Sequence, residues 1–142
     1  MQVMILASIV EEESNDAEDR LKIASTYINR YKKGMLLQAD PTVKFALKDF
    51  ALRRILFGHL KAVSPYNTYL NKGLPPGPIC TPSQQAIESV LNAPKTEYIY
   101  FVASAKFDGS HIFTTNYEDH MKYAREFQAE LTRRQNARKN AP

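Results

Sequence analysis

Three consecutive carboxylates, Glu11, Glu12 and Glu13, end an apolar run near the start of the chain. Successive residues of a helix turn by about 100°, so the three side chains cannot share one environment. Glu13 follows Ile9 by four residues and Val10 by three, and therefore continues the apolar stripe. Desolvation favours the neutral form of a carboxyl group, and a neutral glutamate can serve as a general acid. The alternative is that all three are solvated charges where a core helix meets water.

The other residues that could do chemistry occur in less informative settings. Asp40 precedes Pro41, which predicts the N-cap of a short helix in preference to a catalytic group. His111 follows a tight-turn signal, but no HExxH pattern or Cys/His ligand spacing surrounds it, so we expect no metal site and no cofactor. Cys80 is the single cysteine, which excludes an intrachain disulfide, and it has no obvious local base.

A proline-rich segment in the middle of the chain, Ser64–Ile79, has groups suited to gripping a sugar. Prolines make such a segment stiff and poor in backbone donors. Tyr66, Asn67 and Tyr69 add aromatic faces and an amide. The alternatives are a packed structural loop or a proline-rich recognition ligand.

The pattern of apolar residues and turn signals predicts an α+β fold. Helices are expected over residues 2–13, then from Asp16 to Lys33 with an Asn15/Glu18 capping box and a stop at Gly34. Residues 48–63 suggest a short helix or a lid-like insertion. The remaining expected elements are a short helix from Pro41 to Leu47, a helix after Ser83 with Ala86, Ile87, Val90 and Leu91 inward, a buried strand Glu97–Ala103, a turn at Asp108-Gly109, a strand Ser110–Thr115, and a helix Tyr117–Arg134 with Tyr117, Met121, Ala124, Phe127, Gln128 and Leu131 along one stripe.

The bulk properties indicate one domain over residues 1–142, with a loose tail over residues 133–142. The chain has a formal net charge of +4 and no apolar run long enough to span a membrane. Much of the positive excess lies in the tail and not in a groove, which argues against nucleic-acid binding. Met1 opens directly into a helix pattern, so we expect the chain to be a piece of a longer protein.

Taken in order, many short motifs resemble those of the endolytic murein transglycosylases of the MltG (YceG-like) family. The resemblance runs from Leu6 to about Phe127. The segments that carry it are Leu6–Ser14, Ile28–Arg30, Lys33–Met35, Leu37–Thr42, Ser64–Tyr69, Gly73–Ile79, Pro82, Ala93–Thr96, Tyr98–Ala103, His111 with Phe113, and His120.

The resemblance implies a lysozyme-like arrangement of active-site helices, with a small antiparallel β-sheet or hairpin and a C-terminal helix. It implies that Glu13, which precedes Ser14, is the catalytic acid, with Glu11 in a supporting role. Glu12 stands where the family often has a lysine. The candidates for positioning the glycan are Gln38, Tyr66, Asn67 and Thr68, with Asp40 orienting the loop and His111 as a further contact.

The activity that the resemblance implies is cleavage of the bond between N-acetylmuramic acid and N-acetylglucosamine in peptidoglycan, leaving a 1,6-anhydro end. The whole protein would be anchored at the extracytoplasmic face of the bacterial inner membrane and associate with cell-wall synthesis proteins, although this chain carries no membrane segment. Two alternatives stay open: a glycan-binding module without catalysis, and a basic domain that binds nucleic acid.

Overall fold

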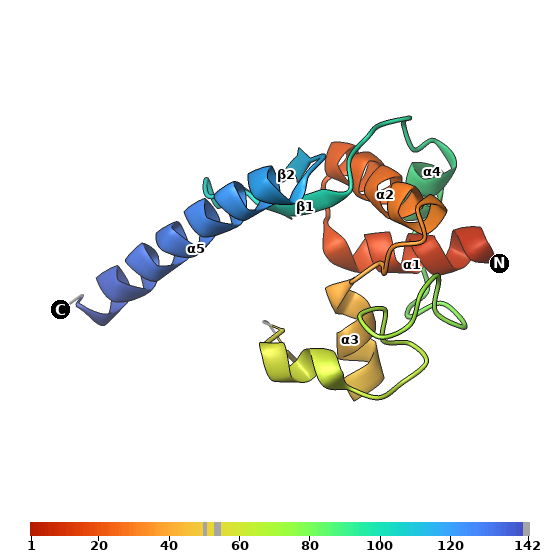
Figure 1. Cartoon of the computed structure of the whole chain (residues 1–142), viewed down its shortest axis with the longest axis horizontal. Helices are drawn as coiled ribbons and strands as arrows, with labels where there is room; N and C mark the ends of the chain where they lie inside the picture. The colour runs from red at the N-terminus through yellow and green to blue at the C-terminus, as the bar shows by residue number, and fades with distance from the viewer. Residues whose placement is uncertain (50, 53–54, 141–142) are drawn as a thin grey trace. The chain divides into compact units, whose positions relative to one another are not determined.

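The structure is a computed structural model that describes residues 1–49, 51–52 and 55–140. The chain forms two compact units, Met1–Thr96 and Glu97–Pro142. Helices make up most of the first unit, and the second consists of a two-stranded antiparallel sheet and the C-terminal helix (Figure 1). The predicted α+β class is therefore confirmed.

Three helices form the centre of the first unit: α1 (Gln2–Glu13), α2 (Ala17–Lys32) and α4 (Gln84–Leu91), each in contact with the other two. A shorter helix, α3 (Asp40–Leu47), also contacts α1. A 3-10 turn, η1 (Phe57–Lys61), follows within residues 48–63 and packs on α3. Phe50, Arg53 and Arg54 lie outside the described residues.

Helix α1 is the core of the first unit. All six residues from Ile5 to Val10 are buried, including the polar Ser8. A helix that is apolar around its whole circumference is stable only when it is covered on every side. The loop before α4 provides part of this cover, because the Ile79 N–H donates to Ser8 Oγ at 3.0 Å. The predicted helix over residues 2–13 is confirmed, and Glu13 is its last residue.

Both ends of α2 are set by local hydrogen bonds. The N-cap is Asp16, whose carboxylate accepts from the Asp19 N–H at 2.9 Å, so the predicted Asn15/Glu18 capping box is wrong by one residue. At the other end Gly34 adopts a positive φ of 70°. This conformation lets the Met35 N–H reach the Arg30 carbonyl at 3.0 Å and confirms the predicted stop.

Helix α4 begins as expected, with Ser83 Oγ accepting from the Ala86 N–H at 3.2 Å. Ala86 is buried, and Ile87 and Val90 are half-buried. Leu91 is 65% exposed, so its predicted inward position is wrong. The helix is only about two turns long, and Leu91 is its last residue.

The second unit contains a hairpin of β1 (Tyr100–Ala103) and β2 (His111–Thr114), in which Phe101 pairs with Phe113. The turn between them includes Gly109 at a positive φ of 85°. Both strands are shorter than predicted, and β1 is half-buried where a buried strand was expected. A two-stranded sheet covered by one helix cannot enclose both of its faces.

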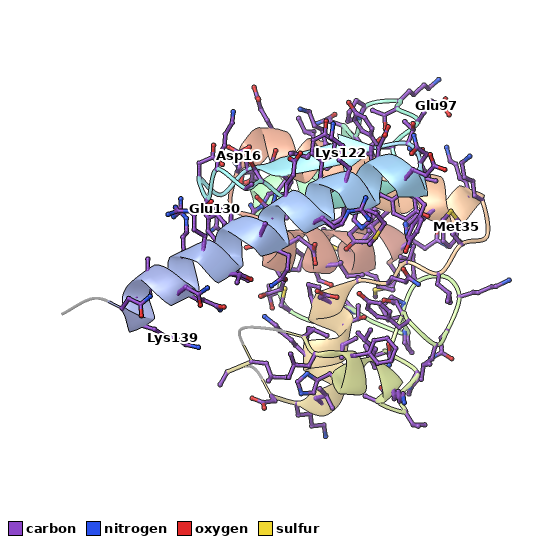
Figure 2. The ribbon with its side chains drawn as sticks, turned by 60° about the vertical axis from the view of Figure 1, so that its left-hand side comes forward. Asp16, Met35, Glu97, Lys122, Glu130 and Lys139 are labelled. Carbon is purple, nitrogen blue, oxygen red and sulfur yellow. The ribbon has the colours of Figure 1, made fainter. Side chains whose placement is uncertain are left out.

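Helix α5 (Tyr117–Lys139) packs on this hairpin through stacked rings and runs five residues beyond the predicted end at Arg134. The His120 ring stacks on Tyr100 with centroids 4.9 Å apart, and Phe127 stacks on Phe107 at 5.0 Å. Of the six residues predicted along one stripe, Tyr117 and Gln128 are exposed, and the other four are half-buried. Figure 2 shows the charged side chains along the rest of α5, Glu130 and Lys139 among them.

Among the described residues, no helix combines the length and the apolar character needed to cross a bilayer.

Candidate active site

Glu13, at the end of α1, is a carboxyl group with an unusual proton affinity. Burial raises the pKa of Glu13 to about 8, and the negative charge of Asp40 adds to the effect. A hydrogen bond from the Tyr27 hydroxyl and the positive charge of Lys44 act in the opposite direction and only partly offset the rise. Glu13 is therefore mostly protonated at neutral pH, as its place in the apolar stripe predicts, and it can donate a proton.

The end of α1 is held in place by Arg20 of α2. Its Nε donates to the Ser14 carbonyl at 2.6 Å, and its guanidinium lies 3.1 Å from the Glu11 carboxylate. Glu11 also accepts a hydrogen bond from Ser83 Oγ at 2.7 Å. Glu11 thus ties α1 to α2 and to the start of α4. We infer that its supporting role is to fix the position of Glu13, because both of its partners belong to the fold.

Asp40 lies in the first turn of α3, where the helix dipole favours a negative charge. The N-cap is Ala39, without a side-chain bond, so the predicted capping role of Asp40 is wrong. Its carboxylate accepts instead from the Tyr69 hydroxyl at 2.5 Å. Asp40 acts on Glu13 through its charge, so the site pairs a protonated carboxyl group with a second carboxylate held by a tyrosine.

Replacing Asp40 with asparagine should lower the pKa of Glu13 by roughly one unit. The change removes a nearby negative charge but leaves the burial of Glu13, which is the larger cause of the shift. The measurement is a carbon-13 NMR titration of the Glu13 carboxyl in both proteins. Asp49→Asn is the matched control, since Asp49 is exposed in the same unit and does not contribute to the shift. An unchanged Glu13 pKa in Asp40→Asn would contradict the electrostatic coupling.

Gln38 is exposed, and its backbone lies in the left-handed region with a φ of 51°. Its N–H donates to the Thr68 carbonyl at 3.2 Å. The preceding turn is held by Arg30, which donates to the Leu36 carbonyl at 2.6 Å. A non-glycine residue at positive φ is held there by the surrounding structure, so the backbone of the loop is fixed at the point where the Gln38 side chain leaves it.

Asn67 and Thr68 are fully buried and do not present their side chains to solvent. The Asn67 amide donates to the carbonyls of Leu60 and Ala62 at 3.0 and 2.8 Å, and its oxygen accepts from the Tyr69 N–H at 2.9 Å. Thr68 Oγ1 accepts from the Ala39 N–H at 2.8 Å. The two residues therefore hold the Ser64–Tyr69 loop against the turn before α3, which is the structural alternative considered for this segment.

Asn67→Ala should destabilise the chain by about 2–4 kcal/mol, because it leaves two partly buried carbonyls without their donors and opens a small void where the fully buried side chain lay. Thermal or urea unfolding would measure the loss. The matched control is Asn71→Ala, which removes hydrogen bonds from the same loop at an exposed position and should cost less than about 1 kcal/mol. Equal losses for the two variants would contradict the special role of Asn67.

Tyr66 is half-buried and packs its ring on Phe45 with centroids 4.7 Å apart. Its hydroxyl lies close to Gly77, where an added Cβ would be 3.1 Å away. Tyr66 therefore keeps part of its surface open beside α3. His111 belongs to the second unit, on β2, where its ring lies edge-on to Phe101 with centroids 5.6 Å apart.

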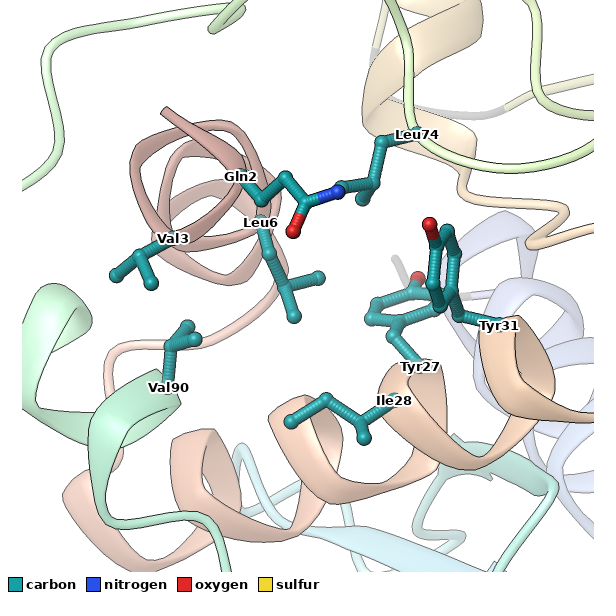
Figure 3. A pocket seen from close by; sticks show the side chains of 8 residues that line it. All are labelled: Gln2, Val3, Leu6, Tyr27, Ile28, Tyr31, Leu74 and Val90. Atoms are coloured by element: carbon teal, nitrogen blue, oxygen red, sulfur yellow. The ribbon is translucent and has the colours of Figure 1, made fainter.

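Two of the cavities in the described part of the chain border α1. One, of about 160 Å³, has walls that are almost wholly apolar (Figure 3). Its lining consists of Gln2, Val3, Leu6, Tyr27, Ile28, Tyr31, Leu74 and Val90. The second, of about 200 Å³, is lined by Glu12, Pro41, Lys44, Phe45, Ile79 and Cys80. Two of these residues are direct chain neighbours of the two carboxylates of the site, Glu12 of Glu13 and Pro41 of Asp40.

No cluster of three or more histidine, cysteine or acidic side chains that could hold a metal ion occurs in the part of the chain that the structure describes. Burial and the nearby Glu12 carboxylate, which accepts a hydrogen bond from the thiol, raise the pKa of Cys80 to about 11. A thiol with this proton affinity is a poor nucleophile near neutral pH.

Several residues that shape the site were not predicted from the sequence. Tyr69 was considered only as a sugar-binding ring, and Tyr27, Lys44 and Arg20 belong to no motif. Tyr27, Tyr69 and Lys44 act on partners at least 14 residues away in sequence, and Arg20 bridges from α2 back to the end of α1. A local pattern carries no signal for such pairs.

Comparison with known proteins identifies relatives over most of the chain. The model of the YceG-like family matches residues 1–126. An endolytic murein transglycosylase of Bacillus subtilis is 44% identical over 85% of this chain and 33% of its own length. One from Streptococcus pneumoniae is 37% identical over 84% of this chain and 22% of its own length.

A solved structure agrees with these matches. The crystal structure of a yceG-like protein from Listeria monocytogenes superposes with a TM-score of 0.79 at 40% sequence identity, covering 84% of this chain and 38% of that one. The chain thus spans about a third or less of the curated relatives that it matches. On the family match and these identities, the chain belongs to the YceG-like family.

Proposed function

We propose that this chain is the catalytic domain of an endolytic murein transglycosylase, a lyase that cuts the β-1,4 bond between N-acetylmuramic acid and N-acetylglucosamine in peptidoglycan. The observation that supports the proposal best is Glu13, a carboxyl group kept protonated near neutral pH at the end of a buried helix. The curated relatives named endolytic murein transglycosylase support the choice of substrate.

In the proposed reaction Glu13 first acts as an acid. It donates its proton to the glycosidic oxygen, the bond between this oxygen and C1 breaks, and the N-acetylglucosamine side leaves with a free hydroxyl. The Glu13 carboxylate then takes the proton of the muramyl C6 hydroxyl while that oxygen bonds to C1. The products are a 1,6-anhydro end and an ordinary strand end, and no water is consumed.

The second carboxylate has a different role in this scheme. A glycosidase that uses water or a covalent intermediate needs a second carboxylate as base or nucleophile. Here the substrate supplies the nucleophile, so Asp40 is needed only for its charge. We infer that ionised Asp40, held by Tyr69, keeps Glu13 protonated before the reaction and favours positive charge at C1 during it.

The glycan contacts that we propose are the exposed Gln38 and the half-buried Tyr66, with His111 as a further candidate. Asn67, Thr68 and Glu11 serve indirectly by holding these groups and Glu13 in place. We further propose that the whole protein acts at the extracytoplasmic face of the bacterial inner membrane, together with cell-wall synthesis proteins, on nascent glycan strands.

The experiment that tests the proposal is digestion of purified peptidoglycan by this chain, with the products read by mass spectrometry. Anhydro-muramyl ends are the expected result. Ordinary reducing ends would mean that the enzyme is a hydrolase, with Asp40 as the first candidate for a base. Binding of glycan strands without any cleavage would favour a non-catalytic peptidoglycan-binding module.

A further inference from the structure

The cavity of about 200 Å³ beside the last turn of α1 has a composition suited to one particular group. Pro41, Phe45 and Ile79 make it apolar on several sides, and Lys44 and Glu12 add one charge of each sign. Glu12 precedes the proposed acid directly, and Pro41 directly follows Asp40. Lys44, on the wall of this cavity, lies near enough for its charge to act on Glu13, so a ligand in the cavity would lie close to the proposed acid.

Lys44 is the group in this cavity that can bind a negatively charged or carbonyl oxygen. It is half-buried, and among the described residues its ammonium has no ion-pair partner. A partly desolvated cation without a partner favours an incoming anion. Lys44 also lies one helical turn after Asp40, and its charge is felt at Glu13.

The other polar groups of the cavity are accounted for. Glu12 is exposed and accepts a hydrogen bond from the Cys80 thiol. The Ser8 carbonyl, 3.3 Å from Cys80 Sγ, is a second acceptor for the same thiol proton, so Cys80 stays protonated and contributes an uncharged side chain to the cavity wall. The carboxylate of Glu12 weakens the binding of an anion without preventing it. Neutralising Glu12 and neutralising Lys44 should therefore change the affinity for an anion in opposite directions.

Building on the proposed function, we propose that this cavity is the subsite for the 3-O-lactyl group of the N-acetylmuramoyl residue, with Lys44 binding the lactyl carboxyl oxygens. The lactyl ether is the chemical difference between N-acetylmuramic acid and N-acetylglucosamine. Its methyl group matches the apolar walls, and its carboxyl group matches Lys44. C3 of the sugar is two ring carbons from C1, so the lactyl group lies close to the bond that Glu13 protonates. Lys44 is thus the residue that determines which of the two sugars precedes the cut.

The test measures binding without catalysis, in the Glu13→Gln background at pH 6. The ligands are an oligosaccharide of alternating N-acetylglucosamine and N-acetylmuramic acid with free lactyl groups, and a chitin oligosaccharide of equal length. Calorimetry should show that the muramyl ligand binds roughly tenfold more tightly. Lys44→Met should remove this preference while leaving chitin binding unchanged. Lys44→Arg should keep it, and Glu12→Gln should increase it severalfold.

A third ligand, the same muramyl strand carrying stem peptides, distinguishes binding of the free lactyl carboxylate from binding of the lactyl amide. Its carboxyl is then a neutral amide, so Lys44→Met should reduce its binding by a smaller factor. If Lys44→Met weakens the binding of the muramyl and chitin ligands equally, or changes the binding of neither, the subsite assignment is overturned while the proposed reaction stands. If the unmutated chain forms no anhydro ends from peptidoglycan, the proposed function fails, whatever the binding preference.

Discussion

Glu13→Gln is expected to reduce the cleavage of peptidoglycan by roughly 10²–10⁴-fold, the usual contribution of a positioned general acid. Glutamine keeps the shape of the side chain and its place at the end of α1 but has no proton to donate to the glycosidic oxygen. The measurement is the rate at which anhydro-muramyl ends appear, followed by mass spectrometry of the released fragments.

Two controls make this result specific. Glu18→Gln neutralises an exposed carboxylate in the first turn of α2 and should leave the rate within about twofold of the unmutated chain. Circular dichroism should show that Glu13→Gln is folded, since the amide is isosteric with the neutral carboxyl group. A Glu13→Gln variant that cleaves at the unmutated rate would remove Glu13 from the mechanism.

The second large effect is expected in the pH dependence of the cleavage rate of the unmutated chain. The acid must be protonated, and the pKa of Glu13 is raised from 4.5 to about 8. The cleavage rate should therefore persist through neutral pH and fall above about pH 8. A rate that already falls near pH 4.5 would mean that Glu13 has the proton affinity of an ordinary glutamate, and the proposed acid would fail.

The free energy of unfolding should also depend on the protonation of Glu13. The unfolded pKa of Glu13 is near 4.5 and the folded value near 8, so between these limits the folded chain binds more protons than the unfolded chain. The free energy of unfolding therefore falls as the pH rises from about 4.5 to about 8. The part of this free energy that comes from the protonated form of Glu13 is fully present below pH 4.5 and is lost above pH 8.

The Glu13→Gln variant isolates this contribution from those of other titrating groups. Relative to the unmutated chain, its stability should be similar at pH 4.5 and greater by roughly 2–4 kcal/mol above pH 8, a range that allows for partial solvent exposure of the side chain. Urea unfolding of both proteins across this pH range measures the difference. A difference that does not change with pH would contradict the half-buried, neutral state of Glu13.

Sequence patterns predicted the elements of the first unit well because their signals are local. The apolar run before Glu11 determined α1, and Gly34 marked the end of α2. Ser83 marked the start of α4. Periodicity also placed Glu13 on the buried side of α1, which is the feature of the site that matters most for its chemistry. In each case the residues that carry the signal lie within one or two turns of each other.

The rest of the site could not be predicted, because it depends on atoms that meet across long stretches of chain. Asp40 and Tyr69 are 29 residues apart, and nothing near Asp40 indicates that its oxygen has a tyrosine for a partner. Asn67 has the amide that a sugar site would use, but the fold uses that amide to hold two backbone carbonyls. Residue type alone does not distinguish these two uses.

The division of the chain at Thr96 leaves all the groups that set the proton affinity of Glu13 in one unit. Each group that contributes to the proton affinity of Glu13, namely Tyr27, Asp40 and Lys44, belongs to the first unit. Substitutions in the hairpin and in α5 can therefore accumulate without direct cost to the acid chemistry.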